Sequence, residues 1–258
     1  MTLIACCSKV PTCPLARHSH HSNVVRVGTY NVFTGTHDVP LTVKVIRQME
    51  ADVVMLQELS PKGGVMISRA LKFDFPYHHF SEGVAILSRF PLKNARYRHS
   101  EHGINGFLFV EVESPGGRLQ VASLHLDPLR IWTAREKWSL PAQLIWGQGE
   151  IHRGEIREIL DALRTDLPTI LAGDFNSANG AAIRELKMLG FTDSYAAVTD
   201  CPNRTPTLHF SLLGFKAGRR IDYIFHDKSF QTVESQVFSG LPSDHDTVVS
   251  VLRWNQNQ

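Results

Sequence analysis

Cysteine is scarce in this sequence, and no long apolar run is present. The 258 residues include four cysteines, and Cys6, Cys7 and Cys13 lie near the start of the chain. Only Cys201 belongs to the body of the chain, so no disulfide framework can form within that body. No apolar stretch approaches the roughly 18 residues that a membrane-spanning helix needs. We therefore predict neither a transmembrane segment nor a small disulfide-bonded scaffold.

A large net charge is also missing. The formal net charge is +2 and the sequence pI is about 8.4. Hydrophobic residues make up 43% and charged residues 20% of the chain, which is typical of a globular protein rather than a disordered one. A dedicated DNA-binding protein usually carries a strong basic stripe, which this sequence lacks. The mild positive balance nevertheless permits an anionic substrate.

Residues 1–22 do not show the pattern of folded elements. Leu3-Ile4-Ala5-Cys6 is similar to the end of a lipoprotein signal, but no basic region or apolar core of about 7–15 residues precedes it. We interpret residues 1–22 as a non-structural leader or tail, or as the result of a misplaced start site. A cytoplasmic location is favoured, and an extracytoplasmic lipoprotein is the alternative if the start site is misplaced.

Residues 23–254 alternate apolar strands with a few amphipathic helices. The predicted helices are one that begins at Pro40, with Leu41, Val45 and Met49 on one apolar face, then Val65–Leu71, Gly149–Leu163, and Ala181–Leu189 closed by Gly190. The predicted strands are Val24–Tyr30, Asp52–Leu56, Gly83–Leu87, Phe107–Val112, Leu119–Leu126, Thr169–Ala172, Ile221–Phe225, Thr232–Phe238 and Thr247–Leu252. This order predicts one mixed α/β (α+β) layered domain without an internal linker.

The segment from Asp127 to Trp146 interrupts this alternation. It combines tryptophans with basic residues, and Pro141 is expected to break any helix there. We predict a loop or broken helix that overhangs the end of the preceding strand. Arg130, Trp132 and Arg135 are candidates for substrate contact by stacking or by binding a phosphate. The alternative is an amphipathic surface segment whose tryptophans pack on the body.

Polar residues occur where the predicted strands begin or end. They are Asn31, Gln57-Glu58, His125, Asp174 with Asn176, Asp222, and Asp244-His245. A single one of them would be explained as a helix cap or a turn residue. Their recurrence at so many strands is harder to explain in that way, because a buried charge is costly unless it is paired or bound to a cation. Loops at strand ends are also where catalytic groups usually lie.

The composition of this set restricts the chemistry. Several carboxylates, two asparagines and two histidines are present, with neither a serine elbow nor a His-Glu-x-x-His motif. Carboxylate-rich sites suit hard cations such as Mg²⁺ or Mn²⁺, whereas zinc prefers more histidine or cysteine. A cation that offsets the charge of an oxyanion, combined with a positioned water, is a general arrangement for phosphate-ester hydrolysis.

The motifs that contain these residues resemble the endonuclease/exonuclease/phosphatase superfamily. They are Thr29-Tyr30-Asn31, Leu56-Gln57-Glu58, Ser123-Leu124-His125-Leu126, Gly173-Asp174-Phe175-Asn176, Arg220-Ile221-Asp222-Tyr223-Ile224-Phe225 and Ser243-Asp244-His245. They follow the order of the superfamily and extend over nearly the whole chain. The superfamily includes pancreatic-type deoxyribonucleases, abasic-site endonucleases, neutral sphingomyelinases, inositol-polyphosphate phosphatases and deadenylases. The resemblance implies a four-layer α/β/β/α sandwich with its site at one end.

The resemblance also implies a role for each residue of the motifs. Glu58 is similar to the main Mg²⁺ ligand, with Asn31 beside it and Asp244 close to the metal or its water shell. Asp174 is similar to the residue that activates the attacking water, and Asn176 to one that holds a phosphate oxygen. His245 matches the second catalytic histidine, which Asp222 orients.

His125 matches the histidine of the deoxyribonuclease and sphingomyelinase branches, where abasic-site endonucleases commonly carry tyrosine. In deoxyribonucleases a glutamate orients that histidine, and Glu82 is similar in placement. The alternative for Glu82 is an exposed acid at the start of a strand.

We therefore predict a Mg²⁺- or Mn²⁺-dependent phosphoesterase that cleaves a phosphodiester in the manner of a nuclease. Nucleic acid and a phospholipid headgroup are the expected partner chemistries, and a monomer is compatible with the sequence. A sphingomyelinase-like enzyme or a phosphomonoesterase for inositol phosphates or other substrates is the main alternative. A catalytically inactive binding module is a remote one, because such proteins usually lose part of the motif set, which is complete here.

Overall fold

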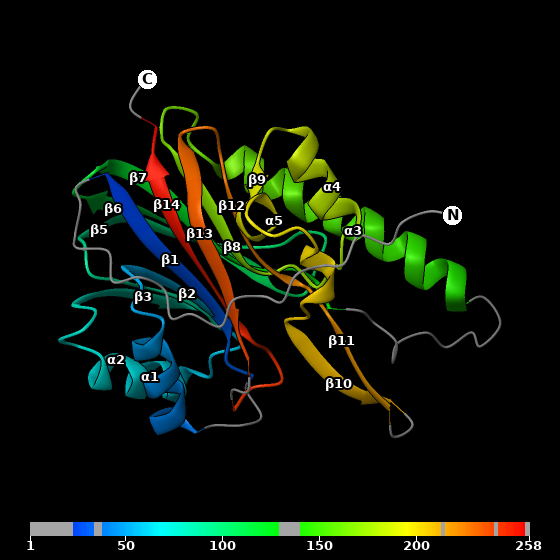
Figure 1. Cartoon of the computed structure of the whole chain (residues 1–258), viewed down its shortest axis with the longest axis horizontal. Helices are drawn as coiled ribbons and strands as arrows, with labels where there is room; N and C mark the ends of the chain where they lie inside the picture. Colours follow the sequence, from blue (N-terminus) through cyan, green and yellow to red (C-terminus); the bar gives the residue numbers. More distant parts are fainter. Residues whose placement is uncertain (1–22, 34–37, 129–139, 213–214, 240–241, 256–258) are drawn as a thin grey trace.

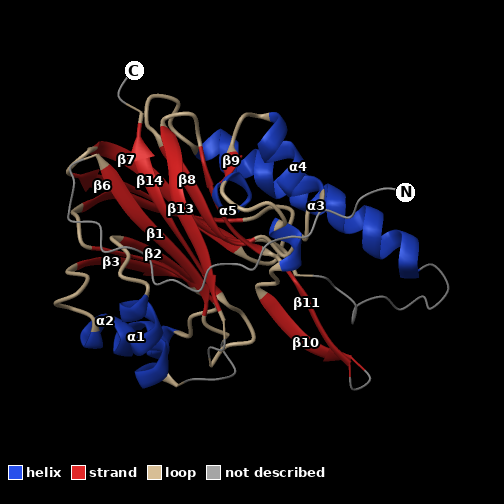
Figure 2. Ribbon diagram, in the orientation of Figure 1, coloured by secondary structure: helices blue, strands red, loops and turns tan. Residues whose placement is uncertain are grey.

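The computed structural model describes residues 23–33, 38–128, 140–212, 215–239 and 242–255. Two six-stranded sheets make up the main body, and a separate two-stranded hairpin projects from one end of it (Figure 1). Helices cover the outer faces of both sheets (Figure 2). The prediction of a four-layer sandwich with mixed sheets is therefore confirmed.

The first sheet has the strand order β13-β14-β1-β2-β4-β3. Strands β1 and β2 are parallel and are connected through helix α1, whereas all other neighbours are antiparallel. Helix α2 packs beside α1 (Figure 1). The bounds are β1 Val24–Asn31, α1 Val39–Gln48, β2 Val53–Gln57, α2 Pro61–Ala70, β3 Tyr77–Ser81, β4 Val84–Ser88, β13 Phe230–Phe238 and β14 Thr247–Trp254.

The second sheet has the order β5-β6-β7-β8-β12-β9. Like the first sheet, it combines one parallel pair with antiparallel neighbours. Its one parallel pair, β7 and β8, is connected through helix α3. The bounds are β5 Leu92–His99, β6 Gly106–Ser114, β7 Gly117–His125, α3 Leu140–Ala162, β8 Thr169–Asp174, α4 Ala181–Met188, β9 Thr192–Asp193, α5 Ser194–Ala197 and β12 Asp222–His226. A 3-10 turn, Pro202–Arg204, leads into the projecting hairpin of β10 (Leu208–Leu212) and β11 (Phe215–Arg219).

Three apolar clusters hold the four layers together. The central cluster lies between the sheets and includes Val27 and Ile170, both fully buried. A second packs α1 and α2 on the first sheet, and a third packs α3 and α4 on the second sheet. Burying a branched aliphatic side chain stabilises a fold by about 1.5–3 kcal/mol, so these clusters supply the main driving force for the sandwich. No helix in the described part of the chain is long and apolar enough to span a bilayer.

The predicted strands and helices all occur, and five strands were not predicted. The hairpin turn at Ser114–Gly117 is confirmed by the pairing of these two residues. The missed strands are β3, β5, β9, β10 and β11. β3 and β5 lie at sheet edges and expose most of their side chains, so their sequences lack the apolar pattern that identifies a strand.

Two predictions about helices were wrong. Leu41 does not belong to the buried face of α1, because it is 43% exposed, whereas Thr42, Val45 and Ile46 are buried. The buried face follows the spacing i, i+3, i+4 from Thr42, and Leu41 lies outside that face. Pro141 does not break a helix either, because α3 begins at Leu140 and Pro141 lies in its first turn, where no N–H partner is required. The predicted irregular segment is therefore helical from residue 140 onward.

Cys201, the only cysteine of the body, is disulfide-bonded. This single bond does not make a disulfide framework within the body. The predicted leader at 1–22 and the predicted substrate contacts Arg130, Trp132 and Arg135 lie outside the described residues.

Candidate active site

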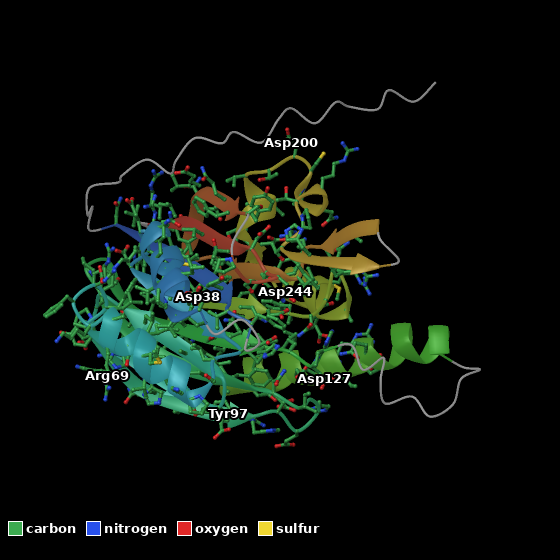
Figure 3. All side chains as sticks on the ribbon, turned by 90° about the horizontal axis from the view of Figure 1, so that it is seen from below. Asp38, Arg69, Tyr97, Asp127, Asp200 and Asp244 are labelled. Carbon is green, nitrogen blue, oxygen red and sulfur yellow. The ribbon has the colours of Figure 1, made fainter. Side chains whose placement is uncertain are left out.

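The strand directions bring the predicted polar residues to one end of the sandwich. The parallel pairs β1/β2 and β7/β8 end there, so Asn31, Glu58, His125 and Asp174 meet at that edge. Strands β12 and β14 run antiparallel to their neighbours and begin at the same edge, which adds Asp222 and His245. Figure 3 shows the molecule from below, with Asp244 near the middle of the face and Asp127 toward the green helix α3.

Glu58 reaches the site through an unusual backbone conformation. It follows β2 with φ +57°, a left-handed value that is rare for residues other than glycine. Its Oε1 accepts a hydrogen bond from Nδ2 of Asn31 at 2.9 Å. The same Asn31 nitrogen donates to Oδ2 of Asp174 at 3.1 Å, while Asn31 Oδ1 accepts from Phe33 N–H. Asn31 therefore bridges two carboxylates that come from different sheets.

Asp174 lies at the centre of the group. Its Oδ2 is 3.8 Å from Nε2 of His125 and also 3.8 Å from Nε2 of His245. Its Oδ1 accepts the backbone N–H of Asn176 at 2.8 Å, which forms a tight turn with Asn176 at φ +46°. Asn176 in turn donates from Nδ2 to the carbonyl of Leu126, the residue after His125. The Asp174 carboxylate therefore contacts or faces most of the other polar side chains of the site.

His245 is held by Asp222 and by the serine of its own motif. Its Nδ1 lies 2.9 Å from Oδ2 of Asp222, and both side chains are almost fully buried. Ser243 Oγ accepts the backbone N–H of His245 and donates to the carbonyl of Asn31, which links β1 to the loop before β14. The ring is therefore fixed on both sides, with Nε2 directed toward Asp174.

The electrostatics of this buried group are strongly perturbed. Burial raises the pKa of Asp174, the charge of Asp222 adds to this effect, and the result is a pKa of about 6. Burial alone would lower the pKa of His245, but the charge and hydrogen bond of Asp222, with the charges of Asp174 and Asp244, raise it to about 10. At neutral pH His245 is therefore a cation beside a cluster of carboxylates.

The donor atoms fit a divalent cation. Glu58, His125 and Asp174 each offer a ligand atom, and these atoms lie within 4.8 Å of one another. Asp174, Asp222 and His245 form a second such group that shares Asp174. In the second group Asp222 is already hydrogen-bonded to His245, which is itself a cation, so the first group is the better cation site. Its two carboxylates match the oxygen preference of Mg²⁺ and Mn²⁺.

Buried polar contacts behind the site join the two sheets. Gln57 precedes Glu58, and its Nε2 donates to Oγ of Ser123 at 3.2 Å, two residues before His125. Thr29 donates to the other end of the same amide, and all three side chains are fully buried. Sequence reasoning noted Gln57 only as part of a motif, although a buried glutamine in an apolar strand indicates such a cross-link.

Some predicted residues are placed less centrally. Asp244 is half-buried and belongs to neither group of possible ligands in the described part of the chain. Glu82 forms a two-residue turn with Gly83 between β3 and β4, and both have positive φ. Among the described residues Glu82 makes no hydrogen bond or ion pair with His125. The orienting role of Glu82 and the metal-ligand roles of Asn31 and Asp244 therefore remain predictions.

Sequence and structure comparisons identify the relatives of this chain. Residues 28–245 match the Endonuclease/Exonuclease/phosphatase family. No curated protein matches the sequence. An endonuclease/exonuclease/phosphatase from Beutenbergia cavernae has a similar fold, with a TM-score of 0.72 and 23% identity over 90% of this chain and 72% of that one.

Two further structures share the fold at lower identity. A humanized TDP2 of D. rerio is 16% identical, with a TM-score of 0.68 over 90% of this chain and 100% of that one. Sphingomyelinase C from Streptomyces griseocarneus is 16% identical, with a TM-score of 0.63 over 88% of this chain and 99% of that one. The family match covers most of the sequence, and the site described above lies inside it. This chain belongs to the endonuclease/exonuclease/phosphatase family, whose members are generally divalent-metal-dependent phosphoesterases.

Proposed function

We propose that this protein hydrolyses a phosphodiester with the help of Mg²⁺ or Mn²⁺, in the manner of a nuclease. The observation that carries the proposal is the position of Asp174. Its Oδ2 lies 3.8 Å from Nε2 of His125 and 3.8 Å from Nε2 of His245. The same oxygen accepts a hydrogen bond from the side-chain amide of Asn31, which also binds Glu58. A buried carboxylate between two imidazoles can align a water, while the imidazoles contact the oxygens of the phosphate that the water attacks.

Glu58 would hold the cation as its main ligand, with Asn31 and Asp244 nearby, while Asp174 acts on the water and His125 on the phosphate. When bound, the cation offsets the negative charge of the phosphoryl oxygens and favours attack on phosphorus. The fit rests on the donor set, because two carboxylates and one imidazole nitrogen already lie within 4.8 Å of one another.

The side chains account for the proton movements of an in-line displacement. Asp174 orients a water and takes one of its protons as the water oxygen bonds to phosphorus. The bond from phosphorus to the leaving oxygen breaks, and His245 supplies a proton to that oxygen from Nε2. His125 and the free N–H of the Asn176 amide stabilise charge on the remaining oxygens. Asp222 keeps the His245 ring oriented through the 2.9 Å contact at Nδ1.

The substrate is proposed at the level of a phosphodiester. The family name includes endonucleases and exonucleases, and His125 occupies the position of the deoxyribonuclease and sphingomyelinase branches. A sphingomyelinase-like activity and a phosphomonoesterase activity are the alternatives. Nucleic acid and lipid headgroups are the proposed partners, and a cytoplasmic location remains our proposal. Arg130, Trp132 and Arg135 remain proposed substrate contacts.

A substrate panel tests this proposal. The full chain is assayed on plasmid DNA, RNA, sphingomyelin vesicles, inositol phosphates and a generic bis-aryl phosphodiester, with Mg²⁺ or Mn²⁺ and with chelator. We expect hydrolysis of the generic diester and of a nucleic acid, lost on chelation and restored by the metal. Turnover confined to sphingomyelin or to inositol phosphates would replace the nuclease-like proposal with the corresponding alternative. Absence of metal-dependent turnover on every substrate would favour an inactive binding module.

A further inference from the structure

Thr207 is a fully buried residue just before β10 that contacts the backbone of Asp222. Its Oγ1 accepts two hydrogen bonds, one from the N–H of Ile221 and one from the N–H of Asp222, each at 3.0 Å. Both amides lie at the start of β12, where Asp222 pairs with Asp174 of β8. The single hydroxyl of Thr207 therefore fixes the backbone from which the Asp222 carboxylate extends.

The same residue also contacts the segment that carries His245. The carbonyl of Thr207 accepts the N–H of Asp246 at 2.6 Å. Next to it, Leu208 forms an isolated antiparallel bridge with His245, and the N–H of His209 donates to the carbonyl of Asp244 at 2.8 Å. Thr207 thus lies between the backbones of the two residues whose side chains form the Asp222–His245 pair.

The orientation of Asp222 depends on this backbone support. Its Oδ2 contacts Nδ1 of His245 at 2.9 Å, whereas its Oδ1 is buried and has no hydrogen-bond partner among the described residues. Within the described part of the chain, no second donor therefore sets the angle of the Asp222 carboxylate. The buried hydroxyl of Thr207 binds two consecutive amides and thereby fixes the position of the Asp222 backbone and of its carboxylate. A small displacement of a group that orients a catalytic residue can reduce catalysis strongly.

We propose that Thr207 is a positioning residue of the active site, which sets the geometry of the Asp222–His245 pair through its hydroxyl and its carbonyl. The inference rests on the proposed function for its effect on turnover, but its effect on the pair can be measured without turnover. Nothing in the strand-end pattern of the sequence identifies Thr207, because the residue lies outside every motif and acts through backbone groups.

The test compares variants of the full chain that differ only in the acceptor. Thr207→Val keeps the shape and removes the oxygen, Thr207→Ser keeps the oxygen, and Thr207→Cys replaces it with a weaker acceptor. Thr205→Val is the matched control, because Thr205 lies two residues earlier and its hydroxyl bonds Tyr195 instead of the site. Turnover of the generic diester is measured together with the NMR signal of the His245 ring N–H, which is assigned by its loss in His245→Gln.

We expect Thr207→Val to lower kcat by about 10- to 100-fold, the range for groups that orient catalytic or metal-binding residues, with KM little changed. The ring N–H signal should shift or broaden in this variant. Both properties should stay near wild type in Thr207→Ser and in Thr205→Val. Thr207→Cys should lie between, and it replaces Thr207→Val in the comparison if that variant does not fold.

Two outcomes would overturn the inference. One is a folded Thr207→Val or Thr207→Cys with the wild-type ring signal and wild-type kcat. The other is an equal loss in Thr205→Val, which would indicate a general effect on stability. If wild-type protein hydrolyses nothing, the proposed function fails, while the ring signal still decides whether Thr207 positions the pair.

Discussion

Nε2 of His245 lies 3.8 Å from Oδ2 of Asp174, although the two residues come from different sheets. The other ring nitrogen contacts a second carboxylate, Asp222, at 2.9 Å. An imidazole between two buried carboxylates is stabilised as the cation, in agreement with its pKa of about 10. The ring can therefore supply a proton at neutral pH. Because Nδ1 is held by Asp222, the proton available to the site is the one on Nε2, which faces Asp174.

Replacing Asp174 with asparagine should separate activity from stability. The amide keeps the size of the side chain but cannot take a proton from water, so we expect turnover to fall by about 10²–10³-fold, the loss typical of a removed transition-state group. Asp174→Ala and His245→Ala should nearly abolish hydrolysis while the protein stays folded. Initial rates on the generic diester and circular dichroism check both statements. Near-wild-type turnover in any of these variants would contradict the assignment.

The stability of Asp174→Asn should depend on pH in a defined direction when a chelator is present. The pKa of Asp174 is raised from 3.8 to about 6 in the folded protein, so its contribution to stability is complete below 3.8 and is lost as pH rises through about 6. Asparagine has no such loss. The free energy of unfolding of the variant should therefore exceed that of wild type above pH 6, and the difference should shrink toward pH 4. A difference that grows on acidification would contradict the raised pKa.

Addition of Mg²⁺ should raise the melting temperature through the carboxylates of the proposed cation site. A ligand at about 100 times its Kd stabilises the folded state by about 2.7 kcal/mol, which differential scanning fluorimetry detects readily. We expect Glu58→Gln to lose most of this shift. Asp244→Asn should lose less of it, because Asp244 belongs to neither group of possible ligands among the described residues. An equal shift in wild type and Glu58→Gln would exclude Glu58 as the main ligand.

The fold and the centre of this site follow from local patterns in the sequence. Buried strands are continuous apolar runs, and a polar residue at their ends is visible without any structure, which is how Glu58 and Asp174 were found. Contacts made through the backbone leave no such pattern. Thr207 was therefore missed, because its hydroxyl binds the backbone N–H groups of Ile221 and Asp222. The edge strands β3 and β5 were missed because they expose most of their side chains and lack an apolar pattern.

Glu82 offers a test of the one orienting role that the contacts do not support. It occupies the first position of a two-residue hairpin turn with φ +43°, followed by Gly83 at φ +84°. Asn-Gly is the preferred pair for a turn with two positive φ values. We expect Glu82→Asn to keep or raise the melting temperature and to leave turnover unchanged. A clear fall in kcat without loss of stability would instead support the prediction that Glu82 orients His125.

The left-handed backbone conformation of Glu58 should lower the free energy of unfolding of the protein. A residue with a Cβ atom in this conformation loses about 1–2 kcal/mol relative to the right-handed one, whereas glycine does not. Glu58→Gly and Glu58→Ala both remove the carboxylate, so both should lose Mg²⁺ binding and turnover. Chemical denaturation should nevertheless show Glu58→Gly to be more stable than Glu58→Ala by about 0.5–1 kcal/mol, after the larger chain entropy of unfolded glycine is included.

Lys62 supplies the matched control for this comparison. It is an exposed residue in the first turn of α2, where the backbone is right-handed and alanine is favoured over glycine. The order of stability should therefore reverse, with Lys62→Ala above Lys62→Gly. If Glu58→Ala were instead more stable than Glu58→Gly, the left-handed conformation at Glu58 would carry no strain. The stability cost of the site would then come from its buried charges alone.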